Sequence, residues 1–202
     1  VRGILTKSPE NIDDKNIALF LGSDFHHVIY PVNPTGDLNF IAIIKYQLSA
    51  EEQKNHSLFN DNPFIKKVLG KIPLKNKDFL NDLKDLKIFP VFVSENFYKL
   101  QNNNIHLIGD AFFAFPPSFA QGASQSIEGA YELFKSIENN TENRFFKNRV
   151  NKTKIVNIRS KFNQFVFHLS NPLTTFFRNI FLKRLVRNKK FLESYLGKVY
   201  RN

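Results

Sequence analysis

The chain has 202 residues, a formal net charge of +11 and no cysteine, methionine or tryptophan. Without cysteine it has no disulfide framework and no thiolate metal site, and its length suffices for one large domain or two small ones with a substantial core. No apolar run reaches the roughly 18 residues of a membrane-spanning helix and no signal peptide is recognisable, so we expect a cytoplasmic location.

The first part of the chain carries the pattern of an antiparallel sheet. Residues 18–22, 26–32 and 37–46 are rich in apolar, β-branched and aromatic side chains, which favour strands. Turn-forming sequences at 23–24 and 34–36 separate the three runs. Because short turns join antiparallel neighbours, we expect these runs to form one sheet.

The segment 75–87 mixes acidic and basic residues, with Asp78, Asp82 and Asp85 among four lysines. Opposite charges three and four positions apart are typical of a solvated helix face, so we expect a helix there. His26 and His27 are adjacent, so on a strand they point to opposite faces, and we predict no metal site from them.

Residues 105–137 follow an order that indicates a ligand site. The apolar run 105–108 is typical of a buried strand, and Gly109-Asp110 places a carboxylate at its end. Open α/β sheets bind ligands at that edge. Pro116 and Pro117 then impose a rigid, extended turn, because each ring fixes its own φ and restricts the preceding residue.

A helix is predicted after Gln121, Gly122 and Ala123. Its apolar residues recur at three- and four-residue steps and therefore share one face: Ile127, Ala130, Phe134 and Ile137. A glycine at the start of a helix lets a ligand approach unsatisfied N–H groups and the positive end of the helix dipole. This arrangement favours an anion or an electron-rich heterocycle.

The charge is concentrated in the last third of the chain. From residue 141 onward there are 15 Lys or Arg residues against Glu142 and Glu193, whereas the first 140 residues hold 14 basic and 16 acidic residues. Apolar residues recur at helical steps on both sides of Asn171-Pro172, which predicts two amphipathic basic helices. We favour a helical cap with a solvated basic face; peripheral contact with an anionic membrane is a second interpretation. No nucleic-acid-binding module is recognisable, and we expect no such partner.

Residues 109–123, GDAFFAFPPSFAQGA, resemble the second FAD motif of the FAD-dependent aromatic hydroxylases built like para-hydroxybenzoate hydroxylase. That motif runs Gly-Asp-Ala-Ala-His, a few residues, Pro-Pro, then Gly-Gln-Gly-Ala. The residues that match in type and spacing are Gly109, Asp110, Ala111, Pro116, Pro117, Gln121, Gly122 and Ala123. Phe113 departs from it, since many members have His there, and Ala120 stands where many have Gly. Residues 19–44 resemble the family's substrate-domain sheet, and 167–185 resemble the C-terminal helices of its salicylate and hydroxybenzoate hydroxylase branch.

The resemblance implies an α/β fold in three parts. An antiparallel substrate-binding sheet would occupy residues 1–100, the second FAD motif and helix of a Rossmann-like FAD-binding domain residues 101–140, and a cap of basic C-terminal helices residues 141–202. The residues implied in FAD binding are Gly109, Asp110, Pro117, Gln121, Gly122 and Ala123. Asp110 would bond hydroxyl groups of FAD, and the N–H groups of Gly122 and Ala123 would face the flavin ring. The residues implied in the substrate pocket are Tyr30, Pro31, Phe115 and Pro116.

The implied activity is hydroxylation of a small aromatic substrate with O2 and NAD(P)H. A ubiquinone-pathway hydroxylase or a flavin-dependent epoxidase is an alternative. The chain contains no Gly-x-Gly-x-x-Gly sequence, which in dinucleotide-binding proteins holds the pyrophosphate. We therefore expect the C-terminal portion of such an enzyme, inactive alone, as a fragment, as the product of a truncated reading frame, or as one half of a split gene whose N-terminal FAD-binding half is a separate partner. A non-enzymatic remnant is the remaining alternative.

Overall fold

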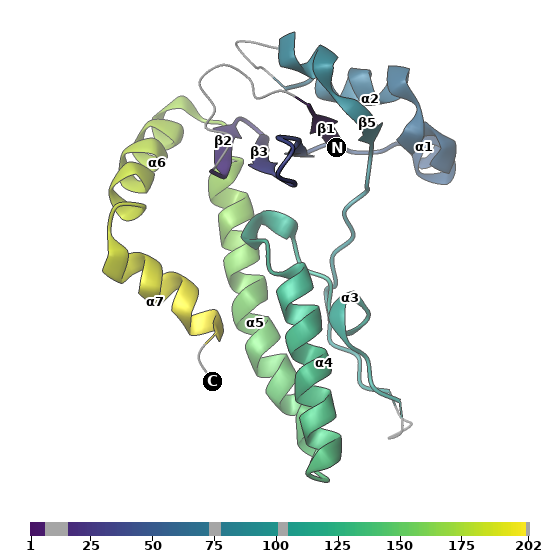
Figure 1. Cartoon of the computed structure of the whole chain (residues 1–202), viewed down its shortest axis with the longest axis vertical. Helices are drawn as coiled ribbons and strands as arrows, with labels where there is room; N and C mark the ends of the chain where they lie inside the picture. The colour runs from purple at the N-terminus through teal and green to yellow at the C-terminus, as the bar shows by residue number, and fades with distance from the viewer. Residues whose placement is uncertain (7–15, 73–77, 101–104, 201–202) are drawn as a thin grey trace. The chain divides into compact units, whose positions relative to one another are not determined.

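The computed structural model describes residues 1–6, 16–72, 78–100 and 105–200 (Figure 1). The chain divides into two compact units. Residues 1–90 and 167–175 form the first, which we call the sheet unit, and residues 91–166 and 176–202 form the second, which we call the helical unit.

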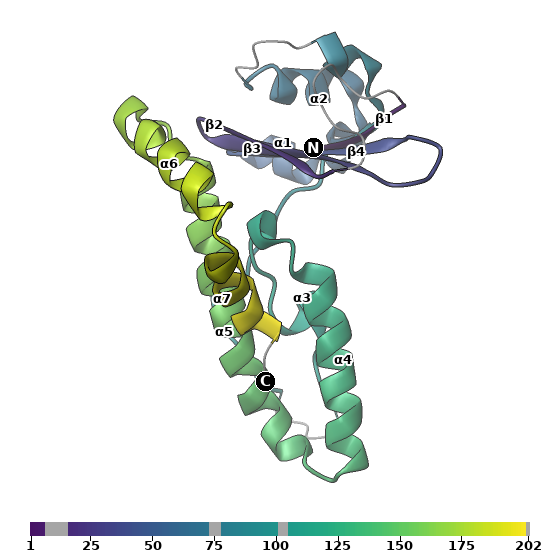
Figure 2. The ribbon, with the colours of Figure 1, turned by 60° about the vertical axis from the view of Figure 1, so that its left-hand side comes forward.

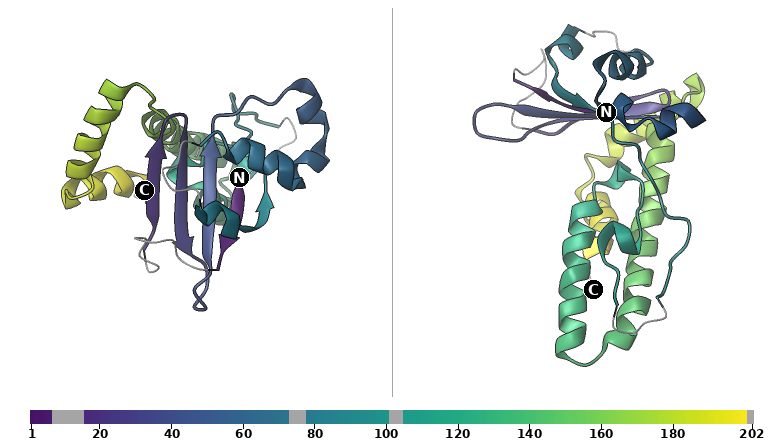
Figure 3. Two further views of the ribbon diagram at one scale, coloured as in Figure 1. Left: turned by 90° about the horizontal axis from the view of Figure 1, so that it is seen from above. Right: turned by 90° about the vertical axis from the view of Figure 1, so that its right-hand side faces the viewer.

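The sheet unit is built on five antiparallel strands in the order β2-β3-β4-β1-β5 (Figure 3, left). Their bounds are β1 Arg2–Leu5, β2 Ala18–Gly22, β3 Phe25–Pro31, β4 Leu38–Ile44 and β5 Lys84–Lys87. The central strands β3 and β4 pair along their whole length, with Ile29 opposite Phe40 and Pro31 opposite Leu38. The three strands expected from the sequence are confirmed as β2, β3 and β4, and the mixed α/β fold class is confirmed with them.

Short helices follow β4 and cover one face of this sheet (Figure 2). They are α1 Ala50–Lys54, the 3-10 turn His56–Asn60 and α2 Asn62–Leu69. Asp61 caps α2 by accepting a hydrogen bond from the backbone N–H of Phe64 at 3.0 Å. Ile65 and Leu69 on α2 pack against Ile29 and Phe40 of the sheet and form the main core.

The helix expected over residues 75–87 is wrong. Asp78–Asp82 is a 3-10 turn and Lys84–Lys87 is the edge strand β5, while residues 75–77 lie outside the described residues. β5 pairs with β1, where Lys87 lies opposite Arg2. The hydrogen bonds of the sheet edge outweigh the small gain from charge pairs along a helix, so the charge pattern misleads here.

The helical unit is dominated by two long antiparallel helices that lie side by side, α4 Gly122–Glu138 and α5 Glu142–Phe167 (Figures 1 and 2). The short α3 Gly109–Phe112 and the 3-10 turn Pro117–Phe119 precede α4. Two further helices, α6 Pro172–Leu185 and α7 Lys189–Tyr200, end the chain. The predicted helices on both sides of Asn171-Pro172 are confirmed, and the Asn171 side chain accepts from the N–H of Leu173 at 2.9 Å at the start of α6.

The buried strand expected at residues 105–108 is wrong. The segment has no strand assignment, and the side chains of Ile105 and Ile108 are exposed. A parallel strand needs neighbours that take its backbone hydrogen bonds, and within the described residues none pairs with this segment. The apolar run therefore needs partner strands in order to form a strand, and the described residues provide none.

Candidate functional site

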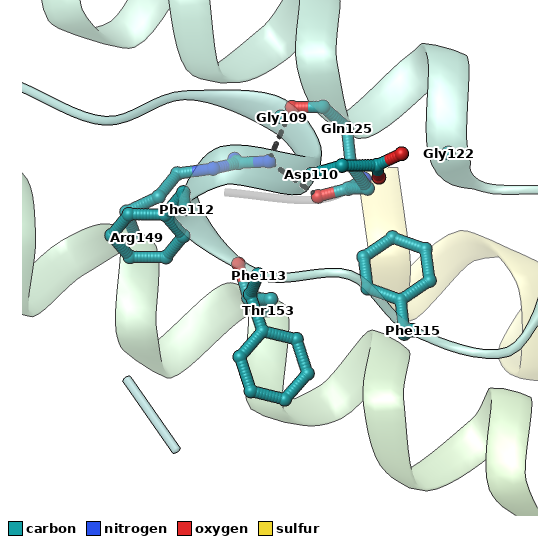
Figure 4. A pocket seen from close by; sticks show the side chains of 9 residues that line it. All are labelled: Gly109, Asp110, Phe112, Phe113, Phe115, Gly122, Gln125, Arg149 and Thr153. Carbon is teal, nitrogen blue, oxygen red and sulfur yellow. Dashed lines mark hydrogen bonds between the residues drawn. The ribbon is translucent and has the colours of Figure 1, made fainter. Parts of the chain in front are cut away.

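The predicted ligand site lies where the chain turns from the apolar run into α3. Gly109 has φ +58°, and a Cβ atom placed there would lie 2.7 Å from Ser126 Oγ of α4. Both the left-handed backbone and the close approach of α4 require glycine at this position. The carboxylate of Asp110, the next residue, is exposed. The Gly-Asp pair of the motif thus closes tightly on α4 and leaves its acid accessible (Figure 4).

The double proline lies in the chain between α3 and α4. Pro116 is extended, with φ −54° and ψ 141°, and Pro117 begins a 3-10 turn. Ala120 ends that turn in the left-handed conformation, with φ 52° and ψ 32°. The extended turn expected from the prolines is present, and Ala120, where the motif it resembles often has glycine, has a backbone that favours glycine.

Gly122 is the first residue of α4, and its surroundings differ from those of Gly109. A Cβ atom at Gly122 would have no atom within 4 Å, and the residue is exposed. Among the described residues, no side chain caps the first turn of α4. The N–H groups of this turn have no acceptor within the helix, and the side chain of Gln121 at the N-cap position does not supply one.

A buried arginine on α5 holds the first turns of α4 in place. Arg149 of α5 has a side chain that is only 4% exposed. Its Nη2 donates to the backbone carbonyl and to the side-chain Oε1 of Gln125, each at 2.7 Å (Figure 4). Its Nη1 donates to Glu132 Oε2 at 3.2 Å. Glu128 Oε2 lies 3.7 Å from Arg149 Nη1 and accepts a hydrogen bond from Gln125 Nε2 at 3.0 Å. This network holds the first turns of α4 against α5.

Gly129 makes room for this arginine. A Cβ atom at Gly129 would lie 3.2 Å from Arg149 Nε. The glycine in the middle of a helix is thus explained by packing rather than by ligand binding. Lys152 extends the network by donating to Glu128 from the next turn of α5.

The predicted FAD-binding residues are brought together in part. Gly109, Asp110 and Gly122 line one cavity with Phe112, Phe113 and Phe115 of the same stretch, and residues outside the motif complete it: Gln125, Arg149 and Thr153. Gln121 is buried, and its side-chain oxygen accepts from Gln125 Nε2 at 3.3 Å. Pro117 and Ala123 are exposed beside the cavity but do not line it.

The cavity itself holds only about 10 Å³, the space of about one water molecule. It cannot enclose a heterocycle, so a planar ligand could only lie across its mouth. Phe113, at the position where the motif it resembles often has His, is one of the lining residues and is buried and stacked on Phe97 with 4.3 Å between the ring centres. That substitution therefore places an apolar ring in the core.

The four residues predicted for the substrate pocket lie in different units. Phe115 is half-buried and packs against the small core of Phe119 and Val156, and Pro116 is buried. In the sheet unit, Tyr30 lies on β3, where its hydroxyl accepts from Asn39 Nδ2 at 2.7 Å, and Pro31 is exposed at the strand end.

No local signal in the sequence marks Arg149. It stands in a basic stretch of α5 that looks like a solvated face, and only its neighbours in the fold reveal the buried role. Gln125 is equally inconspicuous, because glutamine in a first helical turn is common on exposed surfaces.

Comparison with known proteins identifies the fold. No protein-family model matches the sequence, and no curated protein matches it significantly. A variant of HpxO from Klebsiella pneumoniae, solved in complex with FAD, matches with a TM-score of 0.65 and 14% sequence identity over 98% of this chain. HpxO from the same organism with FAD and uric acid matches with a TM-score of 0.61 and 14% identity, also over 98% of this chain. A salicylate hydroxylase–substrate complex matches with a TM-score of 0.59 and 16% identity over 98% of this chain.

At these identities the likeness establishes a shared fold. The chain spans about half the length of the solved structures, 52%, 51% and 55% respectively. The fold is thus shared with HpxO, which has been solved with FAD, and with salicylate hydroxylase, over about half of each of those chains.

Proposed function

We propose that this chain supplies the flavin-ring side and the substrate-binding sheet of an FAD-dependent monooxygenase, which hydroxylates a small aromatic compound with O2 and NAD(P)H. The observation that carries the proposal is Gly122. The fold needs no glycine there, since a Cβ atom would meet nothing and the backbone is ordinary helix. A glycine facing open space at an uncapped helix start is explained when a ligand approaches the backbone.

The residues present fit this cofactor. The N–H groups of Gly122 and Ala123 would face the electron-rich edge of the ring, where negative charge develops on reduction and the helix dipole stabilises it. The exposed Asp110 carboxylate would accept hydrogen bonds from FAD hydroxyl groups. Gly109, Gln121 and Pro117 would shape the turns that hold these groups in place. FAD, when bound, supplies the redox chemistry and the activation of oxygen.

The remaining tasks belong to the protein. Arg149 would hold the start of α4 in a fixed position, which keeps the N–H donors aimed without rearrangement during reaction. Phe115 and Pro116 are apolar groups suited to orienting an aromatic ring and excluding water beside the flavin. Tyr30 and Pro31 keep their predicted role in substrate contact. Uric acid in HpxO and the substrate of salicylate hydroxylase support an aromatic ligand class.

The proposal includes a partner that carries the nucleotide-binding half of the enzyme. The apolar face of α4 points away from α5, with Ile127 72% and Phe134 57% exposed. Gln125 and Gly129, by contrast, are buried. A helix that exposes its apolar stripe lacks the surface that would cover it. We infer that a nucleotide-binding half, carrying the parallel strands that residues 105–108 lack, covers α4.

The deciding experiment combines this chain with a polypeptide that carries a Gly-x-Gly-x-x-Gly unit and is encoded next to it. The copurified pair should be yellow, should oxidise NADH or NADPH, and should consume O2 faster when an aromatic substrate is added. A pair that forms but stays colourless would favour the non-enzymatic remnant. A pair that binds FAD but oxidises a quinone precursor or forms an epoxide would select the alternative substrate classes.

A further inference from the structure

The helix α6 exposes apolar side chains and buries a charged one. Phe176, Phe177, Ile180 and Phe181 are 59%, 50%, 39% and 60% exposed. Their spacing of one and four residues puts them on one face of the helix. The side chain that the helix buries is a cation, Arg178, which is 8% exposed. We call the four exposed residues the α6 stripe.

Arg178 explains how α6 is held in this orientation. Its guanidinium donates to the backbone carbonyl of Val166 at the end of α5, at 3.5 Å, and to Asn179 Oδ1 at 3.1 Å. The basic side chain thus contacts the helical unit, and the aromatic side chains point outward. This is the reverse of the arrangement in a helix that packs its apolar face on a core.

The formal charge of the sequence around the stripe is entirely positive. Between Glu142 and Glu193 the sequence contains 13 Lys or Arg residues and no Asp or Glu. Lys183, Arg184 and Arg187 follow the stripe within two helical turns, and Lys183 and Arg184 are exposed. The apolar face is bordered by cations, and the sequence around it has no acidic residue. It is therefore complementary to a surface that carries negative charge and has an apolar layer beneath that charge.

Two other kinds of occupant fit these observations less well. A second copy of the chain would bring the same cations opposite each other, since a two-fold interface is self-complementary and this region has no acids to pair with. Single-stranded nucleic acid stacks on isolated aromatic rings set in a basic groove. Here the stripe is continuous, includes the aliphatic Ile180, and is convex on a helix.

We propose that α6 is an interfacial helix that attaches the protein to the surface of a bilayer containing anionic lipid. The α6 stripe would enter the boundary between headgroups and acyl chains, while Lys183, Arg184 and Arg187 contact the lipid phosphates. Within the described ranges, no helix has both the length and the apolar character to cross a bilayer. The proposal is independent of the proposed enzymatic function.

The test is cosedimentation of the purified chain with vesicles of phosphatidylcholine alone and of phosphatidylcholine with phosphatidylglycerol. The chain should partition onto the anionic vesicles and be released by high salt. The double variant Lys183→Glu, Arg184→Glu should lower the partition coefficient more than about 25-fold, taking about fivefold for each cation lost. Phe177→Ser with Phe181→Ser should lower it at least about tenfold.

The matched control lies on α4, whose apolar residues are equally exposed. Ile127→Ser with Phe134→Ser should leave vesicle binding within about twofold, and far-ultraviolet circular dichroism should show all variants helical. Equal binding to both vesicle types, or equal loss in the α4 and α6 variants, would show general hydrophobic adhesion and overturn the proposal. Displacement by a short single-stranded RNA, or salt-resistant dimers that bury the stripe, would assign another occupant and overturn it as well. If a variant fails to fold, the unmodified chain still tests the proposal, because its binding must depend on anionic lipid and on salt.

Discussion

Ala120 occupies a backbone conformation that costs an L-residue free energy. Its φ of 52° and ψ of 32° place it in the left-handed region, directly before α4 begins. Glycine adopts this conformation without steric penalty but loses more entropy on folding. We therefore expect Ala120→Gly to raise the free energy of unfolding by about 0.5–1 kcal/mol. Ala130→Gly, inside α4, is the control and should lower it by about 1 kcal/mol. Thermal denaturation measures both, and equal destabilisation would contradict the strain at Ala120.

In the proposed function Gly122 serves ligand binding, whereas the structure explains Gly109 by its backbone conformation and close packing, so substitutions at the two glycines should differ in effect. Because Gly122 has no strained φ and no neighbour within 4 Å, Gly122→Val should change the free energy of unfolding by less than about 0.5 kcal/mol. In the pair that binds FAD, the added side chain should lower FAD affinity at least about tenfold, by blocking approach to the helix start. Gly109→Ala should instead destabilise the fold by about 1–3 kcal/mol. Unchanged FAD affinity in Gly122→Val would remove Gly122 from the site.

Arg149 links two helices through a charge that has little contact with water. Arg149→Met would leave Glu132 without its cation and Glu128 with Lys152 alone, although each carboxylate is about a quarter exposed and can regain some hydration. We expect a loss of about 2–4 kcal/mol in the free energy of unfolding, at or below the range for broken buried pairs. Lys135→Met is the control, because the Lys135–Glu138 pair is exposed and should contribute less than about 0.5 kcal/mol. Similar small losses in both variants would show that the network is not stabilising.

At the scale of elements, β3 is tied to residues 167–175 by a pair of imidazoles. His26 Nδ1 lies 2.8 Å from His168 Nε2, and the backbone N–H of Asp24 donates to the His168 carbonyl at 3.3 Å. Burial, and secondarily the neighbouring His168 and His27, lower the pKa of His26 to about 4. Burial also lowers the pKa of His168, with Asp24 opposing the shift and Lys45 adding to it. The pair is therefore held neutral, with one ring donating to the other.

This pair predicts a loss of stability in mild acid. The unfolded state takes up a proton on His26 near the ordinary histidine pKa of 6.5 and the folded state near 4, so stability is fully present above pH 6.5 and falls as the pH drops toward 4. From His26 alone, we expect a loss of about 2 kcal/mol between pH 7 and pH 5. His27, whose pKa burial lowers to about 4, adds a loss of the same sign. Denaturant titrations should show a shallower pH dependence in His26→Gln and no change in the exposed control His56→Gln; equal slopes in all three would contradict the assignment.

The elements also show what local sequence can predict. β2, β3 and β4 are predictable because alternating runs and turn residues are local signals, and α4, α5 and α6 because their apolar residues recur at helical steps. β5 escapes prediction because its sequence Lys-Asp-Leu-Lys looks like a charged helix face, and it becomes a strand only by pairing with β1. The glycines of the site are predictable from the motif, whereas Arg149 is not, because its partners come from α4, 17 and 24 residues earlier.

For the whole molecule, α4 and the segment before α3 carry apolar surface that the described residues do not cover, in addition to the α6 stripe. Tyr131 and Phe134 of α4, and Ile105 and Ile108 of the unpaired run, are all exposed. A single chain of this kind should associate through these surfaces or with a partner that completes them. The nucleotide-binding half that we infer would supply both the missing strand neighbours and the cover for α4.

The lack of a Gly-x-Gly-x-x-Gly turn predicts how the isolated chain interacts with FAD. In the proposed function the chain offers the ring-side groups Asp110, Gly122 and Ala123, but its sequence holds no Gly-x-Gly-x-x-Gly turn for the pyrophosphate, and the cavity that Asp110 and Gly122 line is about 10 Å³. Ring-side contacts alone leave most of the dinucleotide in water, and the entropy lost on binding then outweighs them. The purified 202-residue chain should therefore be colourless and should not quench the fluorescence of added FAD, whereas HpxO, which has been solved with FAD, serves as the positive control. Stoichiometric flavin in the purified chain would contradict this, because it would mean that one chain holds the whole cofactor and that α4 needs no nucleotide-binding partner.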